Sequence, residues 1–126
     1  MVGTLTISED SDNRLDKWPI RKIKLAWLTD ASGNATKTIG VSGVLLAIGY
    51  EPGTGSTQPD NLYDATVKDS SDTIAYNGST GADLSNVTAT YNALNSNYGY
   101  AINGDIKITI ANAGSGKTGY IYLYLR

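Results

Sequence analysis

The segment whose residue types and spacing come closest to a chemical signature lies near the end of the chain. Residues 111–118 read ANAGSGKT, which matches a relaxed nucleotide-binding loop. In such a loop, backbone N–H groups and the lysine bind phosphate, and the helix that follows directs its positive N-terminal end at the same group. Here residues 119–126, GYIYLYLR, alternate with a period of two and favour a strand instead. We therefore interpret residues 112–118 as a flexible β-hairpin loop with Lys117 at its solvated tip.

The composition excludes several other kinds of chemistry. The chain has no histidine and no cysteine, so it cannot form a Ser-His-Asp or Cys-His arrangement, a thiolate metal site or a disulfide. Its net charge is −2 and its lysines and arginines are scattered, whereas nucleic-acid binding needs clustered positive charge. We predict a protein that is not an enzyme, with no catalytic residues, no metal and no cofactor, and with no nucleic-acid partner.

Four aspartates cluster in the middle of the chain, at Asp60, Asp64, Asp69 and Asp72. A calcium site needs several oxygens that converge on one point, and this spacing fits no EF-hand loop. Aspartates also stabilise turns through their side chains. Nothing in the sequence selects a pair of carboxylates for glycoside hydrolysis. Calcium binding and hydrolysis therefore remain alternatives to the non-enzymatic interpretation.

The elements that would position these side chains are short strands. Apolar and polar residues alternate, or apolar residues run together, in segments that predict strands at residues 2–8, 23–29, 36–41, 44–50, 62–68, 74–77, 106–110 and 119–126. Turn-forming residues 30–34 predict a hairpin over residues 23–41, and Asn103-Gly104 predicts a tight turn. Residues 51–61 predict a long loop, and a short helix is permitted only at residues 85–94.

About eight short strands with regular turn signals are typical of an all-β fold. We predict a single antiparallel β-sandwich or jelly-roll-like barrel over residues 1–126, with residues 1–17 as a candidate extended N-terminal arm. The first ten residues lack the pattern of a signal peptide, and no segment approaches the roughly 18 apolar residues of a membrane span. We therefore expect a soluble protein with no membrane partner.

Tyrosine is unusually frequent, with nine copies and no phenylalanine, and such side chains suit half-buried surfaces. Tyr120, Tyr122 and Tyr124 share one face of the last predicted strand, and that face is covered either by the protein's own fold or by another chain. A second group, Tyr91, Tyr98 and Tyr100, lies among Asn and Gly, where aromatic residues either cover the end of a sandwich or contact a ligand. The candidate interface residues are Trp18, Tyr50, Tyr98, Tyr100, Tyr120, Tyr122 and Tyr124.

Three stretches of the chain carry a resemblance to a known family. They are KLAWLTDASG (residues 24–33) continuing to SGVL (42–45), PDNLYDATVKD (59–69), and NGDIKITIANAG (103–114) followed by the final strand. Together they cover about half of the chain and resemble small virion proteins of tailed bacteriophages, which are usually encoded among the head genes. None of these residues is a catalytic signature.

The resemblance implies a β-rich, non-enzymatic capsid cement or decoration protein that binds the outer capsid over capsomer junctions. Its partners would be the major capsid protein and copies of itself, as a dimer or trimer. It would be made in the host cytoplasm and reside on the phage head surface. The contact surfaces expected are residues 2–17, the loop 51–61 and the tyrosine-lined last strand. The alternative is a carbohydrate- or receptor-binding β-sandwich module, such as a tail, fibre, knob or adaptor component.

Overall fold

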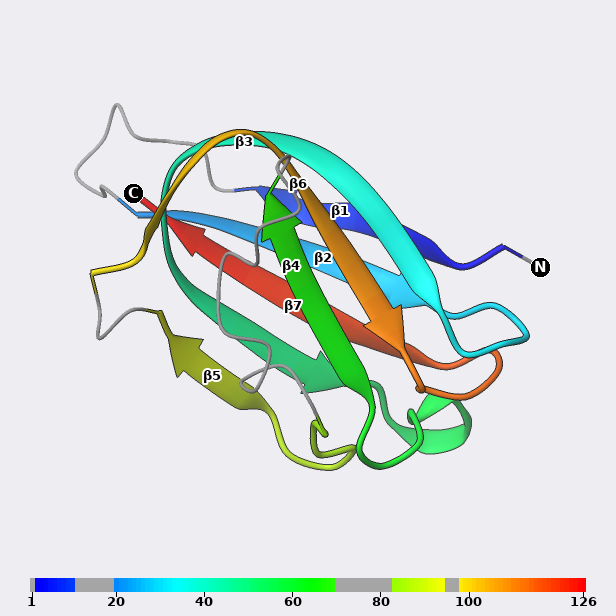
Figure 1. Ribbon diagram of the computed structural model, residues 1–126. Coiled ribbons are helices and arrows are strands. Elements are labelled where there is room, and N and C mark those ends of the chain that lie inside the picture. The colour runs from blue at the N-terminus through cyan, green and yellow to red at the C-terminus, as the bar shows by residue number, and fades with distance from the viewer. Residues whose placement is uncertain (1, 11–19, 70–82, 95–97) are drawn as a thin grey trace.

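Antiparallel strands dominate the structure, a computed structural model that describes residues 2–10, 20–69, 83–94 and 98–126 (Figure 1). In these residues the strands are β1 (Thr4–Asp10), β2 (Arg21–Leu28), β3 (Ala35–Pro52), β4 (Asp64–Asp69), β5 (Thr90–Ala93), β6 (Tyr100–Ala111) and β7 (Thr118–Leu125). One short 3-10 helix, η1 (Gly55–Thr57), follows β3. The strands form one sheet in the order β1-β2-β7-β3-β6-β4, and β5 pairs with β3 as well. The all-β antiparallel prediction is confirmed.

The 18-residue strand β3 belongs to two layers. Its first part, residues 35–45, pairs with β6, and its second part, residues 45–52, pairs with β7. One layer therefore contains β4, β6 and the start of β3, and the other contains β1, β2, β7, β5 and the end of β3. Figure 1 shows β3 curving from the first layer into the second. The sheet is folded over in a sandwich-like arrangement and is not closed into a barrel.

A glycine and a β-bulge allow β3 to change layers. Gly43 has φ of 130°, and a Cβ there would lie 2.7 Å from the backbone oxygen of Arg126, so a side chain is excluded. The pairing with β7 shifts register between Leu45 and Ala47. The bulge inserts one residue, so the inward-facing positions change from odd to even numbers, and Ile48 faces the core. This explains the continuous apolar run that predicted a strand at residues 44–50.

The core lies between the two layers and is made by the inward side of every long strand. Its largest fully buried side chains are Ile23, Leu25, Trp27, Leu45, Ile48, Tyr63, Ile106, Ile108, Ile110, Ile121 and Leu123. β-branched and aromatic residues of this kind pack well on a pleated surface. The buried cluster runs from Leu5 in β1 to Leu125 in β7, so both ends of the chain contribute to it.

Tyr63 offers a test of this packing. Its ring lies 5.6 Å from that of Trp27, centroid to centroid, and burial raises the pKa of Tyr63 to about 12. The unfolded chain loses this proton first, near pH 10, so the stability that the neutral phenol contributes is complete below pH 10. It is lost as the pH rises toward 12, by at most about 1.4 kcal/mol per pH unit. Urea unfolding at about pH 9 and about pH 11.5 measures this change. The free energy of unfolding should fall less between the two pH values for Tyr63→Phe than for the unsubstituted protein. Equal losses would contradict a buried neutral phenol.

Both predicted hairpins are wrong in their pairing. β2 and β3 are consecutive but not paired, because β7 lies between them, and β6 and β7 are likewise separated by β3. The connections at residues 29–34 and 112–117 each pass from one layer to the other. A turn signal indicates that the chain reverses, but it does not distinguish a reversal within a sheet from a crossing between layers.

Three further expectations differ from the structure. The helix permitted at residues 85–94 is wrong, since Thr90–Ala93 forms strand β5. The turn expected at Asn103-Gly104 lies inside β6, where these residues pair with Ser42 and Val41. The candidate arm is corrected in part, because Thr4–Asp10 is strand β1, paired along β2. Residues 11–17 of that arm and the strand expected at residues 74–77 lie outside the described residues.

Candidate binding surface

The outer side of the larger layer carries a group of tyrosines. Tyr120, Tyr122 and Tyr124 of β7 are partly exposed, while the residues that alternate with them are buried, so the two-faced strand expected from the sequence is confirmed. Tyr91 of β5 and two lysines of β2 lie on the same side, as the strand register requires. The surface, named here the tyrosine face, consists of Lys22, Lys24, Tyr91, Tyr120, Tyr122 and Tyr124.

Small residues of β3 make room for these rings. Tyr122 pairs with Gly49, and a Cβ added to Gly49 would lie 3.4 Å from the Cβ and Cδ2 atoms of Tyr122. Tyr124 pairs with Ala47, which is only 1% exposed. The sides of the Tyr122 and Tyr124 rings that face β3 are therefore covered by the protein's own fold, and the other sides are partly exposed to solvent.

Two lysines of β2, on the opposite side of β7 from β3, contact the tyrosine rings. The Lys24 Nζ atom lies 4.3 Å from the centroid of the Tyr120 ring and 5.6 Å from that of Tyr122. The Lys22 Nζ atom lies 4.9 Å from the Tyr122 centroid. Such cation–π contacts are worth roughly 0.5–1 kcal/mol at exposed sites. The tyrosine face thus combines two lysines of β2 with three aromatic rings of β7.

Tyr91 completes the face at its opposite edge. Its ring meets that of Tyr124 edge-on at 5.7 Å, and its side chain is 65% exposed. The sequence grouped Tyr91 with aromatic residues of loops and did not include it among the interface candidates. The alternation in the four-residue strand TYNA is the signal that could have placed it, but the segment is too short to decide between strand and helix.

Two phenols of the tyrosine face, Tyr122 and Tyr124, have a pKa above the ordinary value of tyrosine. Burial raises the pKa of Tyr122, and the charge of Glu51 raises it further, while Lys24 lowers it. Burial and then Tyr91 raise the pKa of Tyr124. The Tyr122 hydroxyl donates a long hydrogen bond of 3.4 Å to Glu51 Oε2. The face can therefore donate hydrogen bonds as well as bury apolar area.

Tyr50, Tyr98 and Tyr100, the remaining aromatic candidates among the described residues, are not part of the tyrosine face. Tyr50 is 2% exposed and belongs to the core, because the bulge in β3 turns it inward, so it does not reach the surface of the chain. Tyr100 is partly buried against the core, whereas Tyr98 is 79% exposed. Trp18 lies outside the described residues.

The segment that matches a nucleotide-binding loop is followed by strand β7 rather than by a helix. Its backbone is held by Thr29, a buried residue whose Oγ1 donates to the Gly114 oxygen at 2.6 Å and accepts from the Lys117 N–H at 2.8 Å. Ala113 is fully buried and its N–H donates to the Gly33 oxygen at 3.2 Å. The segment is an anchored crossing between layers, so the expectation of a flexible hairpin loop is corrected.

Of the four clustered aspartates, Asp64 has a visible structural role. Its Oδ1 accepts the Asp83 N–H at 2.9 Å, and its Oδ2 accepts the Asn112 side-chain N–H at 2.6 Å. Within the described residues, no three acidic side chains gather as they would around a metal ion. Asp72 lies outside those residues.

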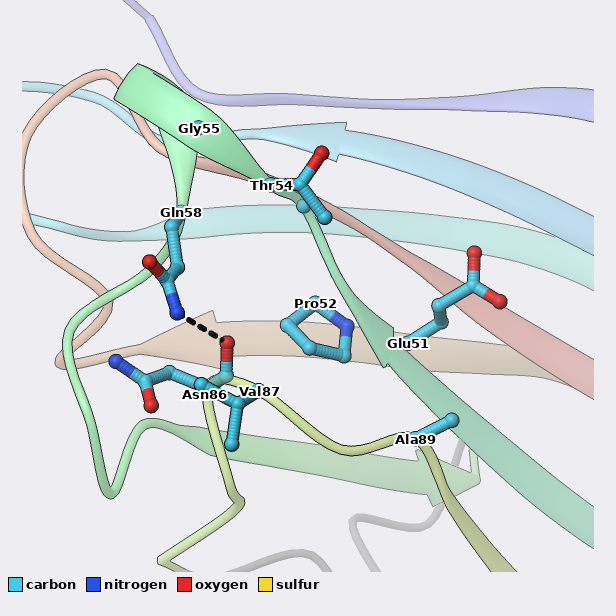
Figure 2. A pocket seen from close by; sticks show the side chains of 9 residues that line it. Glu51, Pro52, Thr54, Gly55, Gln58, Asn86, Val87 and Ala89 are labelled. Carbon is cyan, nitrogen blue, oxygen red and sulfur yellow. Dashed lines mark hydrogen bonds between the residues drawn. The ribbon is translucent and has the colours of Figure 1, made fainter.

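A groove with both polar and apolar lining residues lies at the end of β3, and the sequence did not indicate it (Figure 2). Residues 51–54 border two adjoining pockets of about 390 and 270 Å³. The larger pocket is also lined by Gln58, Asn86, Val87 and Ala89, and the smaller one by Thr57, Thr118 and Tyr120. Figure 2 shows Pro52 between the Gln58–Asn86 pair on one side and Glu51 on the other. These residues come from segments far apart in the sequence, which is why no local motif marks them.

Compared with protein-family models and with the curated proteins, the chain matches none. In the parts of the chain that the structure describes, no helix has the length and hydrophobicity needed to cross a membrane.

Proposed function

We propose that the protein is a non-enzymatic structural component of a phage virion, of the capsid cement or decoration type, and that its tyrosine face docks on the outer capsid. In this proposal its partners are the major capsid protein and further copies of itself, and it resides on the head surface. The sequence resemblance to phage head proteins supports the class of protein. The tyrosine face is the observation that supports docking.

The composition of the tyrosine face suits a protein partner. Tyrosine is enriched at interfaces, where its ring buries apolar area and its hydroxyl forms hydrogen bonds. The contacts of Lys22 and Lys24 with the rings, and the packing of Tyr122 over Gly49, restrict the side chains before binding. Less side-chain freedom is then lost on docking.

Many copies on one particle would multiply a modest interface. Each copy that bridges two capsomers adds a contact that must break before they separate, and linked contacts dissociate far more slowly than single ones. Stabilisation of the shell then requires no chemistry from the protein, which agrees with its lack of histidine and cysteine.

The test is binding to mature capsids of the cognate particle that have been stripped of accessory proteins. The unsubstituted protein should bind saturably, and Tyr122→Ser should bind at least tenfold more weakly, because a central aromatic contact contributes about 2 kcal/mol or more. Tyr98→Ala is the matched control, since Tyr98 is exposed but lies outside the tyrosine face. Absence of saturable binding would refute the proposal, as would an equal loss with the control.

Carbohydrate or receptor binding is the second candidate function. The observation that favours it is the groove at Glu51 and Tyr120, whose lining combines polar and apolar residues and shares only Tyr120 with the tyrosine face.

A further inference from the structure

We infer that the groove around residues 51–54 is a binding site for a neutral saccharide. The inference deepens the second candidate function. The groove shares Tyr120 with the tyrosine face, but the inference does not require docking through that face. The larger pocket, at about 390 Å³, falls within the range of roughly 300–1,000 Å³ that small-molecule sites occupy. The adjoining pocket of about 270 Å³ extends it toward Tyr120, so that together they offer room for more than one sugar ring.

The polar lining selects a ligand that is rich in hydroxyl groups and carries no negative charge. Neither pocket has a lysine or arginine among its described lining residues, whereas the acidic residue Glu51 lines both. A carboxylate accepts hydrogen bonds from hydroxyl groups and repels phosphates and other anions. Thr54 lines both pockets as well, Thr57 lines the smaller one, and Gln58 and Asn86 line the larger one. A neutral sugar supplies hydroxyl donors and acceptors for all of these groups.

The apolar part of the lining suits the C–H face of a sugar ring. Pro52 and Val87 face the larger pocket, and the Val87 side chain is 75% exposed. Tyr120 lines the smaller pocket, and its ring is held by the Lys24 ammonium. Sites of this kind combine a few oriented polar groups with an apolar or aromatic surface.

The groove is shaped by hydrogen bonds within the chain before any ligand binds. Gln58 Nε2 donates to the Asn86 backbone oxygen at 2.8 Å, as Figure 2 shows, and Asn86 Nδ2 donates to the Pro59 oxygen at 3.1 Å. The Val87 N–H donates to Ser85 Oγ at 3.2 Å. Segments 27 or more residues apart are thereby joined, so binding requires little further ordering. One N–H group of each side-chain amide is used in this way.

The experiment is saturation-transfer NMR on the whole chain with a panel of soluble disaccharides that contain glucose, galactose, mannose or N-acetylhexosamine units. At least one should receive saturation, and its affinity is then measured by titration. Glu51→Gln should weaken binding about tenfold by removing the charged acceptor, a change of roughly 1.4 kcal/mol. Val87→Arg should abolish binding by filling the larger pocket, without disturbing the core, because Val87 is exposed.

Asp105→Asn is the matched control, because it neutralises an exposed carboxylate on β6, in the other layer. It should leave sugar binding unchanged. The inference is overturned if no sugar in the panel receives saturation at millimolar concentration, or if Val87→Arg binds as well as the unsubstituted protein. Capsid binding by Val87→Arg is measured in parallel and should be retained, so failure of the saccharide site can be distinguished from failure of the docking proposal.

Discussion

Replacing Thr29 with valine is expected to lower the free energy of unfolding by about 2–3 kcal/mol, although the two side chains have nearly the same shape. The Thr29 hydroxyl donates to the Gly114 oxygen and accepts from the Lys117 N–H, and the residue is fully buried. Valine leaves both backbone groups without this partner in a partly buried setting. Each unsatisfied buried group costs about 1–3 kcal/mol.

Equilibrium unfolding in urea measures this effect, and Thr29→Ser is the control. Serine keeps the hydroxyl and loses one methyl group, which costs about 1 kcal/mol. The serine variant should therefore be more stable than the valine variant. The opposite order would mean that the methyl group of Thr29, and not its hydroxyl, anchors the crossing at residues 112–117.

Replacing Gly119 with alanine is expected to be at least as damaging, with a loss of about 3 kcal/mol. A Cβ at this position would lie 2.3 Å from Cζ2 and 2.6 Å from Cε2 of Trp27, and 2.8 Å from the backbone oxygen of Glu51. The indole cannot move aside easily, because it is buried against Tyr63. Overpacking in a dense core costs about 1–3 kcal/mol, and this case lies at the upper end because a rigid ring and the backbone both block the methyl group.

Gly40→Ala provides the comparison for Gly119→Ala. Gly40 also lies in a strand, but it is exposed, and a Cβ there would meet only the Asp105 carboxylate oxygen at an ordinary 3.5 Å. Its effect on stability should be within about 0.5 kcal/mol. The two variants are compared by thermal and urea unfolding, and similar stabilities would contradict the close packing of Trp27 over Gly119.

Local patterns in the sequence predicted which residues form strands better than they predicted which strands pair. Alternation along residues 23–29 and 119–126 follows from burial of one face, a property of each strand alone. Pairing depends on the whole fold, and here the strands joined by short turns lie in different layers. The β-bulge near Leu45 also cannot be predicted from the local sequence. A continuous apolar run has no alternation of apolar and polar residues, so it gives no sign of a register shift.

The same distinction applies to the candidate sites. Tyr120, Tyr122 and Tyr124 could be assigned to one face because they lie on a single regular strand. Tyr50 was misplaced because its orientation depends on the bulge, and Tyr91 was missed because β5 is short. The groove joins residues 51–58, 86–89 and 118–120, and only the folded chain brings these segments together.

The continuous strand β3 has a mechanical consequence. In a sandwich whose layers share only side-chain contacts, a pull across the layers separates them by peeling apart the core. Here the same pull stretches a peptide chain that is hydrogen-bonded to β6 along one part and to β7 along the other. Rupture would require both sets of bonds to fail in shear, so tension is shared between the layers.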